Sequence, residues 1–237
     1  MAVIEVPARA DPRLIVPLDV PTVEEARSLV ESVGDAVSFY KVGLELFATG
    51  GGMTLAQELK AQGKQVFLDW KLHDIGTTVQ RSAAVLADTG CDFLTVHAEP
   101  QVLKAAVQGR GRSNLKILGV TVLTSLTDAD LVEMGFQESA RQLVERRIHH
   151  AIAAGADGVI ASPHEAELAR KLGGKDFLVV TPGVRPDWSA KNDQARAATP
   201  ADALRAGASH IVCGRPITAA NDPREAALRV AGEMAGV

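Results

Sequence analysis

Four charged residues in the first third of the chain have the types and spacing of a proton-transfer group. They alternate in sign and are Lys41, Asp69, Lys71 and Asp74. Asp69 and Lys71 are two residues apart, so on an extended strand both side chains point to the same face. If the four cluster, neighbouring carboxylates hold each lysine protonated, ready to act as an acid. The alternative is an ion-pair network that ties strand ends together, since a bare D-x-K-x-x-D pattern is common by chance.

Two later segments combine glycine with arginine, a pairing suited to phosphate. One reads Pro-Gly-Val-Arg-Pro and carries Gly183 and Arg185, and the other reads Cys-Gly-Arg-Pro-Ile and carries Gly214 and Arg215. Glycine lets backbone N–H groups approach an anion, and arginine adds fork-shaped charged donors. The alternative is that the glycines make turns and the arginines lie on the surface. Because both segments carry the same chemistry, a phosphate site is favoured.

Eight short apolar runs, separated by helical patterns, must position these residues. Nearly every position in them is apolar, which is typical of parallel strands covered on both faces. The alternation over 237 residues predicts an α/β fold, a single (β/α)8 TIM-barrel domain over residues 1–237. An open doubly wound sheet is the second possibility, weakened because no G-x-G-x-x-G follows the first run. The expected strands are Leu14–Val20, Phe39–Leu46, Val66–Trp70, Phe93–His97, Ile117–Leu123, Gly158–Ala161, Phe177–Thr181 and His210–Cys213, and the expected helices include Thr22–Val33, Thr54–Gln62 and Ser139–Ala154.

The barrel would place all of these polar residues at one end. Carboxyl-terminal strand ends form the active-site face of such barrels, and the loops after strands seven and eight commonly bind phosphate. Asp19 ends the first expected strand, Lys41 lies within the second, and Asp69 and Lys71 end the third. The irregular stretch 182–200 is long for a loop within a domain, which favours a functional segment such as a lid.

Composition excludes several classes of protein. The chain is 46% hydrophobic with a net charge of −4, and no Lys/Arg run exceeds a pair, so no nucleic-acid surface is expected. No apolar run approaches the ~20 residues of a membrane helix, and residues 1–12 lack the apolar core of a signal peptide. Cys91 and Cys213 lie in or beside apolar runs, as reduced core residues do. No cluster has metal-ligand spacing, so we expect a cytoplasmic protein without metal or cofactor.

The segment Asp69–Ile75, which reads D-W-K-L-H-D-I, resembles the D-x-K-x-H-D-I signature of the orotidine 5'-phosphate decarboxylases. Further segments match that family in the expected order, and together they are more specific than any single motif. The resemblance is to its short-chain bacterial type. The further segments are Pro17–Asp19, Lys41–Gly43, Val122–Ser125, Thr181–Pro186, Asp193–Gln194 and Val212–Ile217.

This resemblance implies decarboxylation of orotidine 5'-phosphate to uridine 5'-phosphate, in de novo pyrimidine biosynthesis, without metal or cofactor. Lys71 would donate the proton to C6 of the pyrimidine, with Asp69 beside the substrate carboxylate and Lys41 and Asp74 completing the charged group. The family is a homodimer in which Asp74, Ile75 and Thr78 reach the neighbouring site. The implied binding residues are Asp19, Lys41 and Thr78 for the ribose, Thr124 for the base, and Arg185, Gln194, Gly214 and Arg215 for the phosphate.

One departure from the family pattern opens an alternative. The family usually continues D-I-P-N-T, whereas this chain has Gly76 and Thr77 after Asp74 and Ile75. Loss of the proline is expected to loosen the loop. It also moves the run toward the pattern of metal-dependent sugar-phosphate decarboxylases and aldolases on the same barrel. His73 and the two glycine–arginine segments still favour the orotidine enzyme over those relatives. A phosphate-ligand binder without activity is a further alternative, and the intact Lys41, Asp69, Lys71 and Asp74 argue against it, because a binder has no need of a proton donor.

Overall fold

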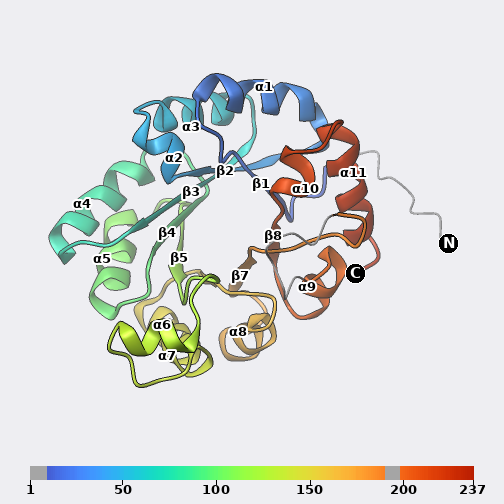
Figure 1. Cartoon of the computed structure of the whole chain (residues 1–237). Coiled ribbons are helices and arrows are strands. Elements are labelled where there is room, and N and C mark those ends of the chain that lie inside the picture. The colour runs from blue at the N-terminus through green and yellow to red at the C-terminus, as the bar shows by residue number, and fades with distance from the viewer. Residues whose placement is uncertain (1–9, 190–197) are drawn as a thin grey trace.

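The computed structural model describes residues 10–189 and 198–237. Within them, eight parallel strands close into a barrel in chain order, with β8 pairing back onto β1. Figure 1 shows the strands at the centre and the helices around them. The predicted (β/α)8 barrel is therefore confirmed. The strands are β1 (Leu14–Pro17), β2 (Phe39–Gly43), β3 (Gln65–Leu72), β4 (Phe93–His97), β5 (Lys116–Val120), β6 (Gly158–Ile160), β7 (Leu178–Thr181) and β8 (His210–Val212).

The helices follow the strands along the chain. Among the described residues, no helix has the length and apolar character needed to cross a lipid bilayer. The helices are α1 (Val23–Val33), the 3-10 turn η1 (Gly34–Ala36), α2 (Leu44–Ala48), α3 (Gly52–Ala61), α4 (Gly76–Ala87), α5 (Pro100–Arg110), α6 (Asp128–Glu133), α7 (Ala140–Ala154), α8 (Ala166–Gly173), α9 (Pro200–Arg205), α10 (Arg215–Thr218) and α11 (Pro223–Met234).

Four of the predicted strand ends were wrong by two or three residues, including that of β5, which ends at Val120 rather than Leu123. β1 stops at Pro17, so Asp19 lies beyond the strand, and β3 continues to Leu72, so Lys71 lies within it. The second run ends at Gly43, and its remaining apolar residues open the short helix α2. Leu46 is the buried residue of that helix. A short apolar run cannot by its periodicity distinguish a strand from a helix, which explains the error.

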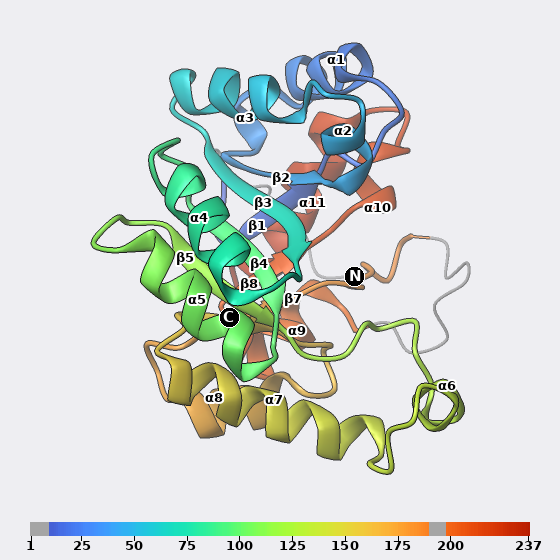
Figure 2. The same cartoon turned by 90° about the vertical axis from the view of Figure 1, so that its left-hand side faces the viewer.

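The helix boundaries follow local signals. Ser139 caps α7 by accepting from the backbone N–H of Gln142, whose side chain bonds back to the Ser139 N–H. Gly155 ends the same helix at a φ of 73°, a left-handed conformation that glycine adopts without a Cβ penalty. The helix expected at Ser139–Ala154 is therefore confirmed. Helix α6, absent from our expected helices, stands at the end of the barrel toward which the β3 arrow points (Figure 2).

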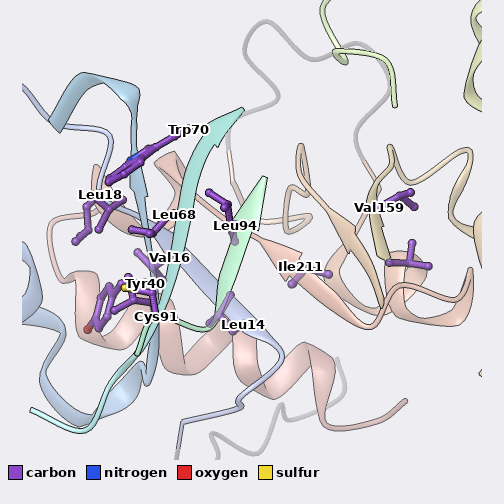
Figure 3. Close-up of a cluster of buried hydrophobic side chains, with 14 of the residues drawn as sticks. Leu14, Val16, Leu18, Tyr40, Leu68, Trp70, Cys91, Leu94, Val159 and Ile211 are labelled. Carbon is purple, nitrogen blue, oxygen red and sulfur yellow. The ribbon is translucent and has the colours of Figure 1, made fainter. Parts of the chain in front are cut away.

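Side chains that alternate along the strands build two separate cores. The outward-facing set packs between the barrel and its helices, and Figure 3 shows Val16, Tyr40 and Leu68 from three adjacent strands in that layer. The inward-facing set fills the barrel itself, as the packed interior of this fold requires. Its centre is Phe93, whose ring lies 4.9 Å from that of Phe39 and 5.9 Å from that of Phe67. The inner set is Ile15, Phe39, Phe67, Phe93, Leu118, Val180 and Val212.

Helices α4 and α5 lie against each other at a glycine. A Cβ added at Gly109 would lie 2.2 Å from the backbone oxygen of Gln80 and 2.9 Å from the Cβ of Ala83. Real Cβ atoms do not approach a backbone oxygen so closely, so the absent side chain sets the separation of the two helices. Because α4 begins directly after the loop at the end of β3, this contact also fixes where that loop ends.

We expect Gly109→Ala to destabilise the protein by about 1–3 kcal/mol, the usual cost of overpacking. The result would run against helix propensity, which by itself favours alanine over glycine by about 1 kcal/mol. Urea denaturation monitored by circular dichroism measures the change in unfolding free energy. Gly236→Ala is the control, because no atom outside its chain neighbours lies within 4 Å of the added Cβ. A Gly109→Ala protein as stable as the wild type would contradict the close packing.

Candidate active site

A cavity of about 460 Å³ lies at the carboxyl ends of the strands, the end at which the sequence predicted the site. Its volume is typical of pockets for small organic molecules. Among the residues that line it, those predicted from the sequence are Asp19, Lys41, Asp69, Lys71, Thr124, Gly183, Arg185, Gly214 and Arg215. Those that the sequence did not single out include Leu44, Phe67, Val120 and Ile160, an apolar set that gave no signal distinct from the core.

Three adjacent strands bring four charges into a continuous chain. Lys41 Nζ lies 2.9 Å from Asp19 Oδ1 and 3.2 Å from Asp69 Oδ2. Lys71 Nζ lies 2.9 Å from the other oxygen of Asp69. The aromatic layer inside the barrel lies directly beneath, because Lys41 and Asp69 each follow an inward-facing phenylalanine by two residues. The sign of the charge alternates along this row of four side chains, so each buried group has a partner of opposite charge.

The ion pairs keep the buried side chains of Asp69 and Lys41 charged. Burial opposes the charge of Asp69, but Lys41 and Lys71 outweigh it and hold the pKa of this carboxyl below its usual value. Burial likewise opposes the charge of Lys41, and the carboxylates of Asp69 and Asp19 raise the pKa of that ammonium above its usual value. Asp69 is therefore an anion and Lys41 a cation at neutral pH.

The backbone at Lys71 is not the regular strand that the sequence predicted. Its φ is 48°, the only left-handed conformation at a non-glycine residue in the described chain. The pairing of β3 with β4 also shifts register between Leu68 and Leu72. Lys71 still meets Asp69, but through a bulge rather than through the alternation of an extended strand.

Thr95 on β4 is a residue at this site that sequence reasoning missed. Its hydroxyl accepts from the Lys71 backbone N–H at 3.0 Å and donates to Asp69 Oδ1 at 2.9 Å. Thr95 has no exposed surface and is not among the residues that line the cavity. A threonine within an apolar strand is ordinary in sequence, so its type gave no signal.

The glycine–arginine segments line the same cavity as the charged residues, as expected for a phosphate site. Arg185 and Arg215 both line it. The backbone N–H of Arg185 donates to the carbonyl of Ala198 at 2.9 Å, which closes the base of the long loop. A Cβ at Gly214 would lie 3.1 Å from Pro17, so glycine suits this close approach. Gln194, the other predicted phosphate ligand, lies outside the described residues.

Asp74, Ile75 and Thr78 do not join the cavity of their own chain. All three are exposed, and none lines the cavity. Asp74 accepts from the backbone N–H of Ile75 at 2.6 Å, and no ion pair within the described ranges involves it. The expected cluster of four is therefore a cluster of Lys41, Asp69 and Lys71, with Asp74 apart.

The altered loop position has room for a side chain. Gly76 is the first residue of α4, and a Cβ there would meet nothing closer than Ala105 at 3.8 Å. Proline is common at this helix position because its missing N–H is unbonded there in any case. The geometry is thus compatible with the family's proline, and the substitution changes the stiffness of the chain rather than its path.

The mouth of the barrel also carries two histidines that are not cavity residues. The rings of His73 and His97 lie 4.7 Å apart, and His73 Nε2 is 3.8 Å from Glu99. Burial lowers the pKa of His97 below its usual value. Throughout residues 10–189 and 198–237, no group of three or more His, Cys, Asp or Glu side chains is arranged to hold a metal ion.

Comparison with known proteins agrees with this geometry. Residues 12–230 match the family model described as "Orotidine 5'-phosphate decarboxylase / HUMPS family". The chain is 75% identical to the orotidine 5'-phosphate decarboxylase of Caulobacter sp. (strain K31), over 96% of this chain and 99% of that one. It is 52% identical to that of Rhodopseudomonas palustris (strain BisB5), over 96% and 98%. The crystal structure of the Lactobacillus acidophilus decarboxylase superposes with a TM-score of 0.82 at 39% identity, over 94% of this chain and 99% of that one. The chain therefore belongs to the orotidine 5'-phosphate decarboxylase / HUMPS family.

Proposed function

We propose that this protein decarboxylates orotidine 5'-phosphate to uridine 5'-phosphate. The observation that carries the proposal is that the ion-paired residues Lys41, Asp69 and Lys71 line the same cavity as Arg185 and Arg215. The ion-paired residues suit a carboxylate that must leave, and the arginines suit a phosphate that must stay. Relatives up to 75% identical carry the name of this activity. A role in de novo pyrimidine biosynthesis and a cytoplasmic location belong to the same proposal.

Lys71 is the proton donor in this mechanism. The bond between C6 and the carboxylate breaks, carbon dioxide leaves, and the electron pair stays on C6. The Lys71 ammonium first stabilises this developing negative charge and then transfers a proton to C6, becoming a neutral amine. A substrate carboxylate bound beside ionised Asp69 experiences a like-charge repulsion that ends when it departs as carbon dioxide. The reaction needs no metal or cofactor.

The residues that bind the phosphate supply binding energy away from the reacting carbon. The two arginines and the backbone around Gly214 hold the phosphate, with Gln194 as a further ligand. Asp19 and Lys41 contact the ribose, and Thr124 contacts the base. Energy from such a remote group can be spent on holding the pyrimidine carboxylate against Asp69.

A metal-dependent sugar-phosphate lyase is the alternative on the same barrel. The family model alone does not separate the two, because its description names both groups. The relatives at 75% and 52% identity are both named orotidine 5'-phosphate decarboxylases, which favours the proposed reaction. The two activities also differ in whether a chelator abolishes them.

Two copies of the chain form the working enzyme in this proposal. Asp74 lies apart from the other charges of its own chain, and Ile75 beside it is 70% exposed, a large apolar side chain in water. Both observations fit a loop that reaches the site of a second subunit, where Asp74, Ile75 and Thr78 complete the charged group and the ribose contacts. A two-fold dimer would then hold two such shared sites.

The wild type is expected to turn over orotidine 5'-phosphate in excess chelator, and Lys71→Ala to lose at least ~10³-fold in kcat, because it lacks both the cation and the proton. An absorbance assay of pyrimidine decarboxylation measures both. Lys104→Ala, which removes an exposed lysine of α5, should keep wild-type activity. Loss of wild-type activity on chelation would favour the sugar-phosphate alternative, and a well-folded Lys71→Ala enzyme with near-normal turnover would exclude Lys71 as the donor.

Arg215→Ala should lower kcat/KM for orotidine 5'-phosphate by about 10- to 150-fold, the equivalent of a lost charged hydrogen bond of about 1.5–3 kcal/mol. The same variant should lose little toward orotidine, which has no phosphate to hold. Steady-state kinetics with both substrates gives the comparison. Arg205→Ala is the control, because that arginine is 62% exposed and pairs with Asp202. Equal losses on both substrates would show that Arg215 does not bind the phosphate.

Mixing inactive Lys71→Ala and Asp74→Ala proteins should restore activity if each site takes Lys71 from one chain and Asp74 from the other. Random exchange makes half the dimers mixed, and one site of each mixed dimer is intact, so about one quarter of all sites recover. The matched control mixes Lys71→Ala with Lys41→Ala, because those residues serve the same chain's site through Asp69 and every mixed site keeps one defect. No recovery after verified subunit exchange would mean that Asp74 does not act across a dimer.

A further inference from the structure

Thr95 on β4 lies opposite an irregular stretch of β3, the strand that carries Lys71. Leu68 pairs with Leu94 and Leu72 pairs with Val96, so β3 advances from 68 to 72 while β4 advances from 94 to 96. A regular parallel ladder advances equally on both strands. Thr95 is therefore the one β4 residue between the two paired positions, and it faces the β3 residues 69–71 alone.

The Thr95 hydroxyl accepts the hydrogen bond that a backbone carbonyl would accept in a regular ladder, and it also bonds a neighbouring carboxylate. It accepts from the Lys71 backbone N–H at 3.0 Å and donates to Asp69 Oδ1 at 2.9 Å. A hydroxyl has one hydrogen to donate, and the N–H can only donate, so the hydroxyl hydrogen is left for the carboxylate. Asp69 Oδ1 is the same oxygen that lies 2.9 Å from the Lys71 ammonium. One side chain thus fixes both ends of the Asp69–Lys71 pair.

The Lys71 backbone needs such support. A left-handed φ is unfavourable for a residue with a side chain, and it persists only where the surroundings enforce it. Lys71 has this conformation at a φ of 48°, and its N–H is bonded to the buried Thr95 side chain. Without that acceptor, the N–H would be an unpaired donor at the floor of the site.

We propose that Thr95 is a positioning residue, whose hydroxyl holds the Lys71 backbone in its left-handed conformation and fixes the Asp69 carboxylate that orients the Lys71 ammonium. The proposal rests on the proposed function, because its effect is on proton transfer by Lys71. Thr95 has no exposed surface and does not line the cavity, so it acts through these two residues rather than on the substrate.

The test compares variants that differ by the hydroxyl. Thr95→Val removes it at nearly constant shape, and Thr95→Ser keeps it. Thr95→Ala, compared with Thr95→Ser, gives a second hydroxyl-only difference should the valine variant fold poorly. The matched control is Thr121→Val, since Thr121 is equally buried and donates to the Ile160 carbonyl at 2.7 Å without touching the charged chain. Each full-length protein is assayed with orotidine 5'-phosphate, and binding of uridine 5'-phosphate is measured separately.

Thr95→Val is expected to lower kcat by about 10- to 100-fold, the effect of a lost hydrogen bond to a charged group. The KM and the affinity for uridine 5'-phosphate should change by less than about threefold, since the residues that line the cavity are unchanged. Thr95→Ser should recover most of kcat, and Thr121→Val should keep wild-type kcat. Wild-type kcat in Thr95→Val, or equal losses in Thr95→Ser and Thr95→Ala, would overturn the proposal.

The pH profile separates positioning from a general loss of stability. Against the effect of burial, the ammonium groups of Lys41 and Lys71 hold the pKa of Asp69 down and the Thr95 hydroxyl adds to their effect, while Asp19 lies beyond Lys41. Loss of the hydroxyl raises the pKa of Asp69, so the acid limb of kcat/KM should move to higher pH in Thr95→Val and stay in place in Thr121→Val. An unmoved limb would overturn the proposal. A wild type without activity on orotidine 5'-phosphate would overturn the proposed function and this inference together, whereas an active wild type matched by Thr95→Val would overturn this inference alone.

Discussion

Burying a lysine inside a barrel is possible here only because opposite charges accompany it. Lys41 lies on β2, with Asp19 and Asp69 within ion-pair distance on either side. Removing water from an ion costs several kcal/mol, and two carboxylates at close range compensate for that loss. The closed barrel matters because it places β1, β2 and β3 side by side with their carboxyl ends at the same end of the barrel. The aromatic layer lies beneath these charges, and Lys41 and Asp69 are the most deeply buried of them.

Much of this arrangement could be predicted from the sequence, because its causes are local. Apolar runs long enough for one strand, separated by helical patterns, leave few folds other than the barrel. Lys41, Asp69 and Lys71 stood out because charges are rare within such runs, and the barrel then placed them at one end. The glycine–arginine segments were found in the same way, since both follow strands that finish at the same face.

The remainder depends on how distant segments meet. The bulge in β3 arises from its pairing with β4, so neither the left-handed φ of Lys71 nor the contacts of Thr95 could be predicted from the spacing of Asp69 and Lys71. Spacing alone left open whether Asp74 joins the other charges, and the structure places it apart from them in its own chain, just before α4 begins at Gly76. Leu44 shows the limit of apolar periodicity, since it begins a helix and lines the cavity.

The aromatic layer has a consequence for traffic through the molecule. Phe93 packs against both Phe39 and Phe67 inside the barrel, so side chains fill the interior below the charged residues. A molecule released at the bottom of the cavity therefore cannot leave through the opposite end of the barrel. In the proposed reaction, the carbon dioxide released beside Asp69 must therefore pass the nucleotide that still occupies the mouth of the barrel, or leave after that nucleotide dissociates. Both products would then leave through the same opening. The order in which carbon dioxide and the nucleotide leave would depend on their sizes and on how tightly the phosphate is bound.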